Sequence, residues 1–338
     1  MEKVRFGVVG LGQMGTRFSR IISESPRADL TAVADIDPAR VEETIGQWGG
    51  SGHGDVETLL SDAGEVDALV IATPDQLHVE PSVAGARAGK HLFVEKPLAF
   101  TEGDCRTIIA EVEDAGVKLL VGQTLRWDPR FSSARDAIRE GRIGELVHTF
   151  SRRNNPHTVV HNYKGRVSIA YFLGIHDIDF LLWSIDSKVK QVYAAGRRGF
   201  LTAQGYDLYD TVFSILTFES GVVSCLENSW WVPDNAPGRM YAHMFEAEGT
   251  SGDIHLIPEQ TGLMVRGVGF CDYPNAVYAP ETQGRFGGVY RDEIEHFIDC
   301  IVADAPLVAT GAEATRAVAA VEAVHRSLEI GAPVEVEI

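Results

Sequence analysis

The chain has 338 residues, enough for two or three domains and a sizeable hydrophobic core. Hydrophobic residues make up 45% of it, and no apolar run approaches the roughly 20 residues that a membrane span needs. The formal net charge of -18 argues against non-specific binding to nucleic acids or anionic membranes.

The cysteines have no spacing typical of a metal site or of a disulfide framework; they are Cys105, Cys225, Cys271 and Cys300. The sequence enters an apolar run within three residues of Met1, so we expect no signal peptide. These features predict a cytoplasmic protein with reduced thiols. No histidines or acids have a spacing that requires a metal ion, and we expect none.

A dinucleotide-binding fingerprint occupies the N-terminal part of the sequence. An apolar run over residues 4–9 is followed by Gly10-Leu11-Gly12-Gln13-Met14-Gly15, an amphipathic segment over residues 16–24, and an apolar run over residues 30–34 that ends on Asp35. Gly10 allows a tight turn, Gly12 lets the backbone approach a pyrophosphate, and Gly15 lets the helix pack closely on the strand. A glycine turn that binds nothing would not need this context, which therefore favours a dinucleotide site.

Asp35 predicts NAD rather than NADP. Its carboxylate would accept hydrogen bonds from the adenosine ribose hydroxyls and would repel a 2′-phosphate. Ile36 adds no positive charge. Arg40 is close enough to bind a 2′-phosphate, or it stacks on the adenine, and both alternatives stay open.

The next elements predict a doubly wound parallel sheet. Helices are expected over residues 38–47, 56–60, 77–88 and 101–115, and strands over residues 67–72, 91–95 and 118–122. Residues 49–54 resemble a flexible glycine-rich loop. Because strands alternate with helices, residues 1–122 are assigned to an NAD(P)-binding Rossmann domain.

The second half has an α+β pattern. Helices are expected over residues 129–140, 175–184, 290–302 and 311–329, and strands over residues 145–153, 189–195, 211–218, 222–229, 241–248, 252–256, 262–265 and 333–338. Residues 154–166 form a polar loop. We expect residues 123–338 to form a substrate-binding and oligomerisation domain with a large, mostly antiparallel sheet. An uncovered apolar face on such a sheet predicts a homodimer or homotetramer.

Chemistry is expected at the carboxyl ends of the parallel strands, where ligands of doubly wound folds bind. Three segments end there: Thr73-Pro74-Asp75, Glu95-Lys96-Pro97 and Gly122-Gln123-Thr124. Lys96 is either an ordinary lysine at a strand end or a group that polarises a substrate oxygen during hydride transfer. The Lys96–Pro97 bond is a candidate for the cis form.

Histidines supply the candidate general bases. His176 opens a predicted helix and either packs there or takes a proton from a hydroxyl near neutral pH. His157 and His161 share the polar loop with Tyr163, where they either line a substrate cleft or are solvated. His78 and His148 look structural.

These stretches together resemble the Gfo/Idh/MocA oxidoreductases, such as glucose–fructose oxidoreductase and inositol dehydrogenase. The resemblance spans nearly the whole chain, through residues 10–15, Ala72-Thr73-Pro74 with His78, Glu95-Lys96-Pro97, residues 174–179, residues 126–129, and Tyr290, Glu293 and Phe297. It implies NAD(P)-dependent oxidation of a secondary hydroxyl on a sugar or cyclitol. It also implies that Lys96 is the catalytic lysine and His176 the general acid/base.

The resemblance also implies two sets of binding residues. The cofactor would contact Gly10, Gly12, Gln13, Met14, Gly15, Asp35, Ile36, Arg40, Thr73, Pro74, His78, Glu95, Lys96 and Gln123. The substrate would contact Lys96, Arg153, Asn155, His157, Tyr163, Phe172 and His176.

Phe172 departs from the family pattern, because many members have an aspartate there. Phenylalanine can neither bind a hydroxyl nor orient His176, so specificity is expected to differ from inositol, with Tyr163 or Asp177 as the alternative partner. Asp75 replaces the usual asparagine and adds a charge near the cofactor. Two other functions stay open: a glycosidase that retains NAD and uses transient oxidation, and a non-catalytic NAD-sensing regulator.

Overall fold

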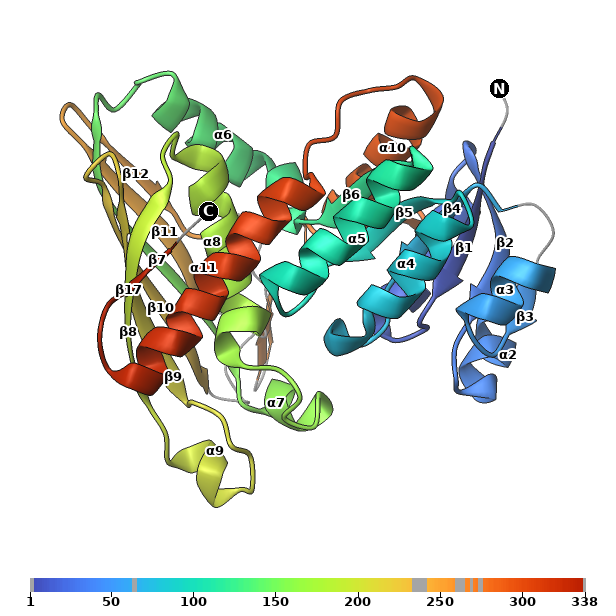
Figure 1. The fold of residues 1–338 in the computed structure, drawn as a ribbon, viewed down its shortest axis with the longest axis horizontal. Helices are drawn as coiled ribbons and strands as arrows, with labels where there is room; N and C mark the ends of the chain where they lie inside the picture. Colours follow the sequence, from blue (N-terminus) through green and yellow to red (C-terminus); the bar gives the residue numbers. More distant parts are fainter. Residues whose placement is uncertain are drawn as a thin grey trace. The chain divides into compact units, whose positions relative to one another are not determined.

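The computed structural model describes residues 3–62, 66–232, 242–258, 265–267, 270–272 and 276–336. The chain forms two compact units (Figure 1), one made of Met1–Trp127 with Val277–Thr315 and the other of Asp128–Ala276 with Arg316–Ile338. The sequence suggested one boundary at residue 122. Instead, the chain returns to the first unit after residue 276, so that both units are discontinuous.

The first unit contains a six-stranded parallel sheet with the order β3-β2-β1-β4-β5-β6. Its strands are β1 (Val4–Val9), β2 (Ala28–Ala34), β3 (Ser51–His53), β4 (Ala68–Ile71), β5 (His91–Glu95) and β6 (Leu119–Gly122). Its helices are α1 (Gln13–Glu24), α2 (Pro38–Trp48), α3 (Val56–Asp62), α4 (Val79–Arg87), α5 (Glu102–Ala115) and α10 (Val289–Val302), with short 3₁₀ turns η1 (Asp75–Leu77) and η2 (Thr124–Trp127). The predicted Rossmann-type sheet is confirmed.

Local signals explain several helix boundaries in this unit. Asp37 caps α2 by accepting a hydrogen bond from the backbone N–H of Ala39 at 3.1 Å, and Pro38 occupies the first turn. Thr101 caps α5 through the N–H of Asp104, also at 3.1 Å. Gly116 ends α5 with a φ of 64°, a conformation that glycine adopts without strain.

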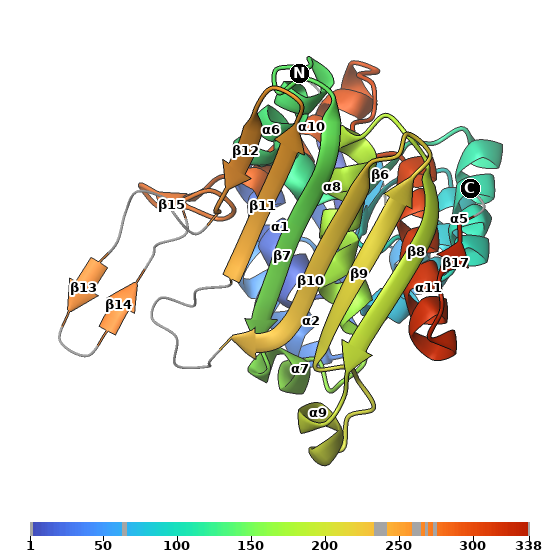
Figure 2. The same cartoon turned by 90° about the vertical axis from the view of Figure 1, so that its left-hand side faces the viewer.

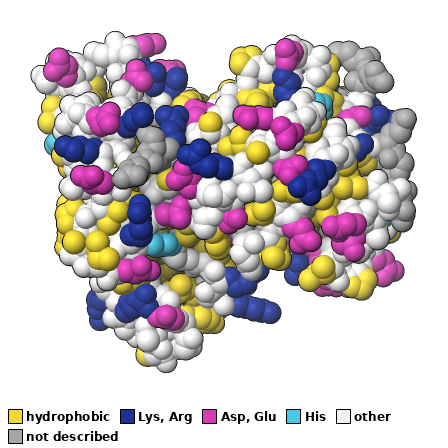
Figure 3. All heavy atoms as spheres, in the orientation of Figure 1, with side chains coloured by type: hydrophobic (Ala, Val, Ile, Leu, Met, Phe, Trp, Pro, Cys, Tyr) yellow, Lys and Arg dark blue, Asp and Glu magenta, His cyan; other side chains and the backbone are white. Residues whose placement is uncertain are grey.

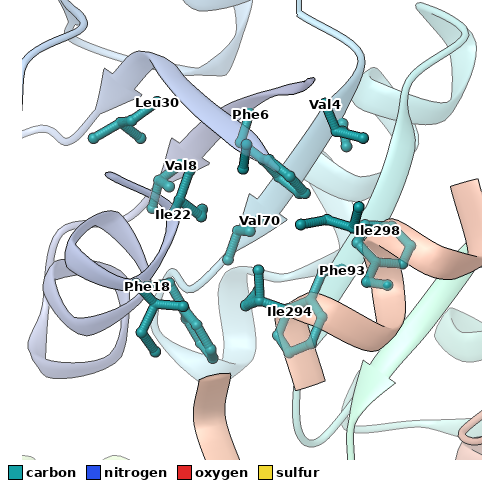
Figure 4. Packing of buried hydrophobic residues seen from close by; sticks show 14 of the residues in the cluster. Val4, Phe6, Val8, Phe18, Ile22, Leu30, Val70, Phe93, Ile294 and Ile298 are labelled. Carbon is teal, nitrogen blue, oxygen red and sulfur yellow. The ribbon is translucent and has the colours of Figure 1, made fainter. Parts of the chain in front are cut away.

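The core of the first unit requires α10. Ile294 and Phe297 of this helix have no solvent exposure, and they pack with side chains of the parallel strands. Figure 4 shows Ile294 and Ile298 of α10 among side chains of these strands. The Phe297 ring lies 6.3 Å from that of Phe6 and 6.1 Å from that of Phe93. A segment late in the sequence therefore completes a core that begins at β1.

The second unit contains a seven-stranded mixed sheet with the order β12-β11-β7-β10-β9-β8-β17. The strands are β7 (Leu146–Pro156), β8 (Val189–Arg197), β9 (Thr211–Phe218), β10 (Val223–Val232), β11 (Ala242–Gly249), β12 (Asp253–Leu256) and β17 (Val334–Glu335). β7 and β10 pair in parallel, and the other neighbours pair antiparallel. The mostly antiparallel sheet is confirmed.

Helices lie on one face of this sheet. They are α6 (Pro129–Arg139), α8 (Ile175–Ser184) and most of α11 (Gly311–Ile330), while α7 (Thr158–Asn162) and α9 (Phe200–Ala203) are short connections. The predicted polar loop over residues 154–166 begins inside β7 and contains α7. Most of the predicted strand over residues 262–265 lies outside the described residues, and so does the first residue of the predicted strand over residues 241–248. In this region the structure describes two short strands, β13 (Val265–Gly267) and β14 (Phe270–Asp272). A second small hairpin joins β15 (Glu281–Thr282) and β16 (Arg285–Phe286).

No described helix covers the opposite face of the large sheet (Figure 2), and apolar side chains gather there on β8, β9 and β10. On it, Tyr193, Phe213, Ile215 and Val223 are 39–44% exposed. Tyr193 and Cys225 are the cross-strand neighbours of Ile215, so these side chains form a continuous patch, which we call the open sheet face.

Charged side chains of both signs are interspersed over the surface shown in Figure 3. None of the helices in the described ranges combines the length and apolarity that a bilayer crossing requires. None of the described cysteine side chains, Cys105, Cys225 and Cys300, is in a disulfide bond.

Candidate functional site

The glycine turn between β1 and α1 is shaped for a bound anion. A Cβ on Gly10 would lie 2.6 Å from the backbone N of Thr73, and one on Gly15 would lie 1.7 Å from the Gly10 carbonyl oxygen. Gly12, by contrast, has nothing within 4 Å of its Cβ position. No side chain caps α1, and its first turn has no acid, so its N-terminal N–H groups suit a phosphate.

Asp35 closes this turn from the end of β2. Its Oδ2 accepts a hydrogen bond from the N–H of Leu11 at 2.6 Å, and its Oδ1 accepts one from the N–H of Asp37 at 2.9 Å. Each carboxylate oxygen can accept a further hydrogen bond, as ribose hydroxyls would require. Nη1 of Arg40 lies 3.9 Å from Oδ2 of Asp35, and the Arg40 side chain is 53% exposed.

A cavity of about 520 Å³ adjoins Asp35. It has the size and mixed lining of a small-molecule site, and Ile36, with 92% exposure, lies at its edge. Sequence analysis missed most of its lining residues: Pro38, Val41, Glu42, Ile45, Gly52, His53 and Gly54. The helix start at Asp37–Pro38 was the signal in the sequence for these lining residues. It could have suggested that α2, which begins there, forms a wall of this cavity.

His78 holds together the segments that follow β4 and β5. Its side chain is fully buried, and its ring nitrogens lie 2.7 Å from the Pro97 carbonyl oxygen and 3.1 Å from that of Thr73. Burial lowers the pKa of His78. In the first unit taken by itself, the ring of His78 therefore faces backbone rather than open space. The Lys96–Pro97 bond is cis, as the sequence suggested.

Lys96 follows the last residue of β5. It is half-buried, whereas its neighbours Glu95 and Pro97 are buried. The backbone N–H of Lys96 donates to Oε2 of Glu95 at 3.1 Å, and burial raises the pKa of Glu95 to about 7. Gln123, after β6, is 2% exposed, so that its amide also belongs to the interior. Only the lysine of this group is partly open to solvent within its unit.

In the second unit, His176 shares a helical face with Phe172. The residues from Ile169 to Leu181 are buried except for these two, which are half-exposed. A π-helical turn, η3 (Ala170–Gly174), leads directly into α8, and such turns are frequent at functional sites. The two side chains therefore form the accessible part of this segment.

Aromatic rings surround Phe172. Its ring centroid lies 4.9 Å from that of Tyr163 and 5.5 Å from that of Trp230. His157 instead packs against His161 and Phe200, at centroid distances of 5.9 and 5.0 Å. Tyr163 thus lies beside Phe172, as a substrate-lining role would need, whereas His157 packs in a separate group of rings.

Arg153 and Asp177 form a buried ion pair between β7 and α8. Nε and Nη2 of Arg153 donate to the two carboxylate oxygens of Asp177, each at 2.9 Å. The side chains are only 7% and 3% exposed. Burial raises the pKa of Asp177, while Arg153 opposes this shift. Because both charged groups are engaged in this ion pair, we assign the pair a structural role. This role disfavours Asp177 as the partner of His176. Asn155 approaches His243 at 3.4 Å.

Comparison with known proteins gives this geometry its context. Residues 4–123 match the oxidoreductase family with an NAD-binding Rossmann fold, and residues 131–255 match the GFO/IDH/MocA C-terminal domain. An inositol 2-dehydrogenase of Rhizobium meliloti (strain 1021) is 30% identical over 329 residues, which cover 96% of this chain and 97% of that protein. This chain belongs to the Gfo/Idh/MocA oxidoreductase family.

Other members of the Gfo/Idh/MocA family agree in length and fold. A scyllo-inositol 2-dehydrogenase (NAD(+)) of Bacillus subtilis is 28% identical and is covered over 97% of its length by 100% of this chain. The crystal structure of a putative myo-inositol dehydrogenase from Sinorhizobium meliloti 1021 has a TM-score of 0.83 and 27% identity, covering 99% of this chain and 100% of that one. The chain is thus an oxidoreductase, and neither the glycosidase nor the regulator alternative is favoured.

Proposed function

We propose that this oxidoreductase oxidises a secondary hydroxyl on a cyclitol or sugar ring with NAD. The proposal rests chiefly on the Asp35 carboxylate, which closes the phosphate-binding turn and keeps acceptor capacity for ribose hydroxyls. The two relatives named inositol 2-dehydrogenase and scyllo-inositol 2-dehydrogenase (NAD(+)) support the substrate class.

Lys96 and His176 are the proposed catalytic residues. When bound, NAD supplies the acceptor for the hydride that leaves the carbinol carbon. The Lys96 ammonium group holds the reacting oxygen and stabilises the negative charge that develops on it. The His176 imidazole accepts the hydroxyl proton, so that one proton and one hydride leave the substrate and a ketone forms. His78 positions the loop that carries Lys96, through the Pro97 carbonyl.

Phe172 and Tyr163 are the proposed specificity residues. Their rings lie 4.9 Å apart on the half-exposed side of the segment that carries His176. The Phe172 ring binds the C–H face of a sugar better than a hydroxyl, since unlike an aspartate it offers no strong hydrogen-bond acceptor. We therefore expect a preferred substrate that lacks at least one of the ring hydroxyls of inositol, or that carries an apolar substituent there.

The first test is NADH appearance with purified protein and a panel of cyclitols, aldoses, deoxysugars, uronic acids, glycosides and nucleotide sugars. NADP in parallel reactions tests the cofactor preference. Activity in one class, lost in Lys96→Met and His176→Asn but retained in Lys188→Met, would support the assignment. Full turnover in Lys96→Met would exclude the lysine role, and reaction with none of the panel despite measured NAD binding would contradict the proposed function.

A further inference from the structure

Two carboxyl groups are buried together in the first unit. Glu95 ends β5 and is 7% exposed, whereas Glu293 lies in the first half of α10 and has no exposure. Contact between the Phe93 and Phe297 rings, 6.1 Å apart, holds β5 and α10 side by side. Each glutamate raises the energy of the other's ionised form, because the medium between them has a low dielectric constant.

The polar atoms of this region have few hydrogen-bond partners. Oε1 of Glu95, both oxygens of Glu293 and both amide atoms of Gln123 are buried, and none makes a hydrogen bond of normal geometry within the described chain. The Cβ position of Gly122 is 3.5 Å from the Glu95 carboxyl carbon, which places this carboxyl beside the residue that precedes Gln123. A buried polar atom without a partner costs roughly 1–3 kcal/mol, and a proton on one of these carboxyl groups would lower this cost by supplying a donor.

The surrounding charges affect the two glutamates differently. Lys96 and Arg17 favour the ionised form of Glu95, and Asp75 opposes it. Near Glu293 the charged neighbours are Glu95 and Asp292, both of which oppose ionisation, and only the Thr124 side chain favours it. Tyr290 is a further neighbour of this region, and the Arg17 guanidinium lies 4.5 Å from its ring centroid.

Burial is the main cause of the pKa shift at both sites. It raises the pKa of Glu95 to about 7, and it raises that of Glu293 well above the ordinary value. The difference follows from the neighbours, since Glu95 has cations beside it and Glu293 does not. Glu293 is therefore the harder of the two to ionise, and Glu95 is the one that takes up charge as the pH rises through about 7.

We propose that Glu95 and Glu293 form an internal acid pair in which Glu293 holds a proton and the charge of Glu95 positions Lys96 and keeps it cationic. Glu95 acts through its hydrogen bond from the Lys96 backbone N–H and through its field, so it is a positioning residue. This proposal rests on the proposed function only for the role of Lys96. The protonated pair itself can be observed without any substrate or cofactor.

Infrared difference spectroscopy of the complete NAD-free protein tests the pair directly. Protonated carboxyl groups have a C=O band that is distinct from that of carboxylates. We expect part of this band to persist at a pH where exposed carboxyl groups are fully ionised, and a further part to titrate near pH 7. Absence of any such band in the wild-type protein would overturn the proposal without the need for a variant.

Three isosteric variants assign the band. Glu293→Gln should remove the persistent component, Glu95→Gln should remove the component that titrates near neutral pH, and the exposed control Glu57→Gln should remove neither. If Glu293→Gln leaves the persistent component in place, Glu293 does not hold the proton.

Steady-state kinetics then test the positioning role. Glu95→Gln should lower kcat by about tenfold or more with a smaller change in KM, because the reacting lysine and not the ground-state contacts is disturbed. Glu293→Gln replaces a neutral acid by a neutral amide and should keep the wild-type pH profile. An unchanged kcat and pH profile in Glu95→Gln would refute the positioning role. If no substrate is found, the infrared result still decides whether the acid pair exists.

Discussion

Asp35 has two roles, which a substitution at this position can test. Its carboxylate anchors the glycine turn through Leu11 and, in the proposed function, also repels a 2′-phosphate. We expect Asp35→Ser to raise the KM for NAD about tenfold or more, because a charge-assisted hydrogen bond is lost, and to narrow the preference for NAD over NADP. Initial rates with both cofactors measure this preference.

Asp37→Ser is the matched control. Serine also caps helices, so that α2 keeps its start, and the side chain of residue 37 hydrogen-bonds Ala39 rather than the turn. Its cofactor preference should equal that of the wild-type protein. Equal shifts in the two variants would instead indicate a general disturbance of this region.

Glu95 should also affect stability as the pH changes. Its pKa rises from 4.5 to about 7 on folding, so its contribution is fully present below the lower value and is lost as the pH rises through about 7. The free energy of unfolding of Glu95→Gln, relative to wild type, should therefore increase by about 3 kcal/mol across this interval. Denaturant titrations at several pH values measure it, and a difference independent of pH would contradict the shift.

At the scale of elements, the Arg153–Asp177 pair fastens α8 to β7. Arg153→Met would leave the Asp177 carboxylate buried without its cation, and we expect a loss of about 3–5 kcal/mol in the free energy of unfolding. Urea denaturation monitored by tryptophan fluorescence is the measurement. The sequence had suggested that Arg153 binds substrate, and this pair explains its burial without a ligand.

The double variant Arg153→Met/Asp177→Leu distinguishes a lost pair from lost packing. Removing both charges should recover most of the stability, because neither member is then left buried alone. If the double variant is as unstable as the sum of the two single variants, the ion pair contributes no coupling and our interpretation is wrong.

Elements that hydrophobic periodicity specifies were predictable, and those fixed by tertiary contacts were not. β4, β5 and β6 have apolar runs at their centres, and α2 and α5 have explicit caps. β3 was taken for a loop, since Ser51-Gly52-His53 has no apolar pattern and pairs with β2 through its backbone. The π-helical turn before α8 has no local sequence signal either.

At the scale of the whole molecule, the open sheet face should hold an oligomer together. We expect Ile215→Lys to weaken self-association by about tenfold or more, because it places a charge in the middle of the apolar patch. Sedimentation velocity at several concentrations measures this. Val302→Lys, at an exposed valine of α10, is the control and should sediment as the wild type does.

The candidate site was predictable as a list of motifs but not as a set of roles. The glycine turn, Asp35 and the Glu95-Lys96-Pro97 segment carry their chemistry in local order, which a sequence displays. The burial of a side chain, by contrast, cannot be read from the local order of residues. His78 and Gln123 were assigned to the cofactor, and the structure buries both side chains, while the acid pair depends on Glu293, almost two hundred residues after Glu95.

The late return of α10 has a consequence for biosynthesis. When β6 emerges from the ribosome, the sheet of the first unit still lacks Ile294 and Phe297, which fill its core. At about 5–20 residues per second, the nascent chain would expose this apolar face for on the order of ten seconds. Chaperones that recognise exposed apolar segments have this interval in which to bind. The N-terminal sheet therefore cannot finish folding as an independent early domain, and must wait until most of the polypeptide has been translated.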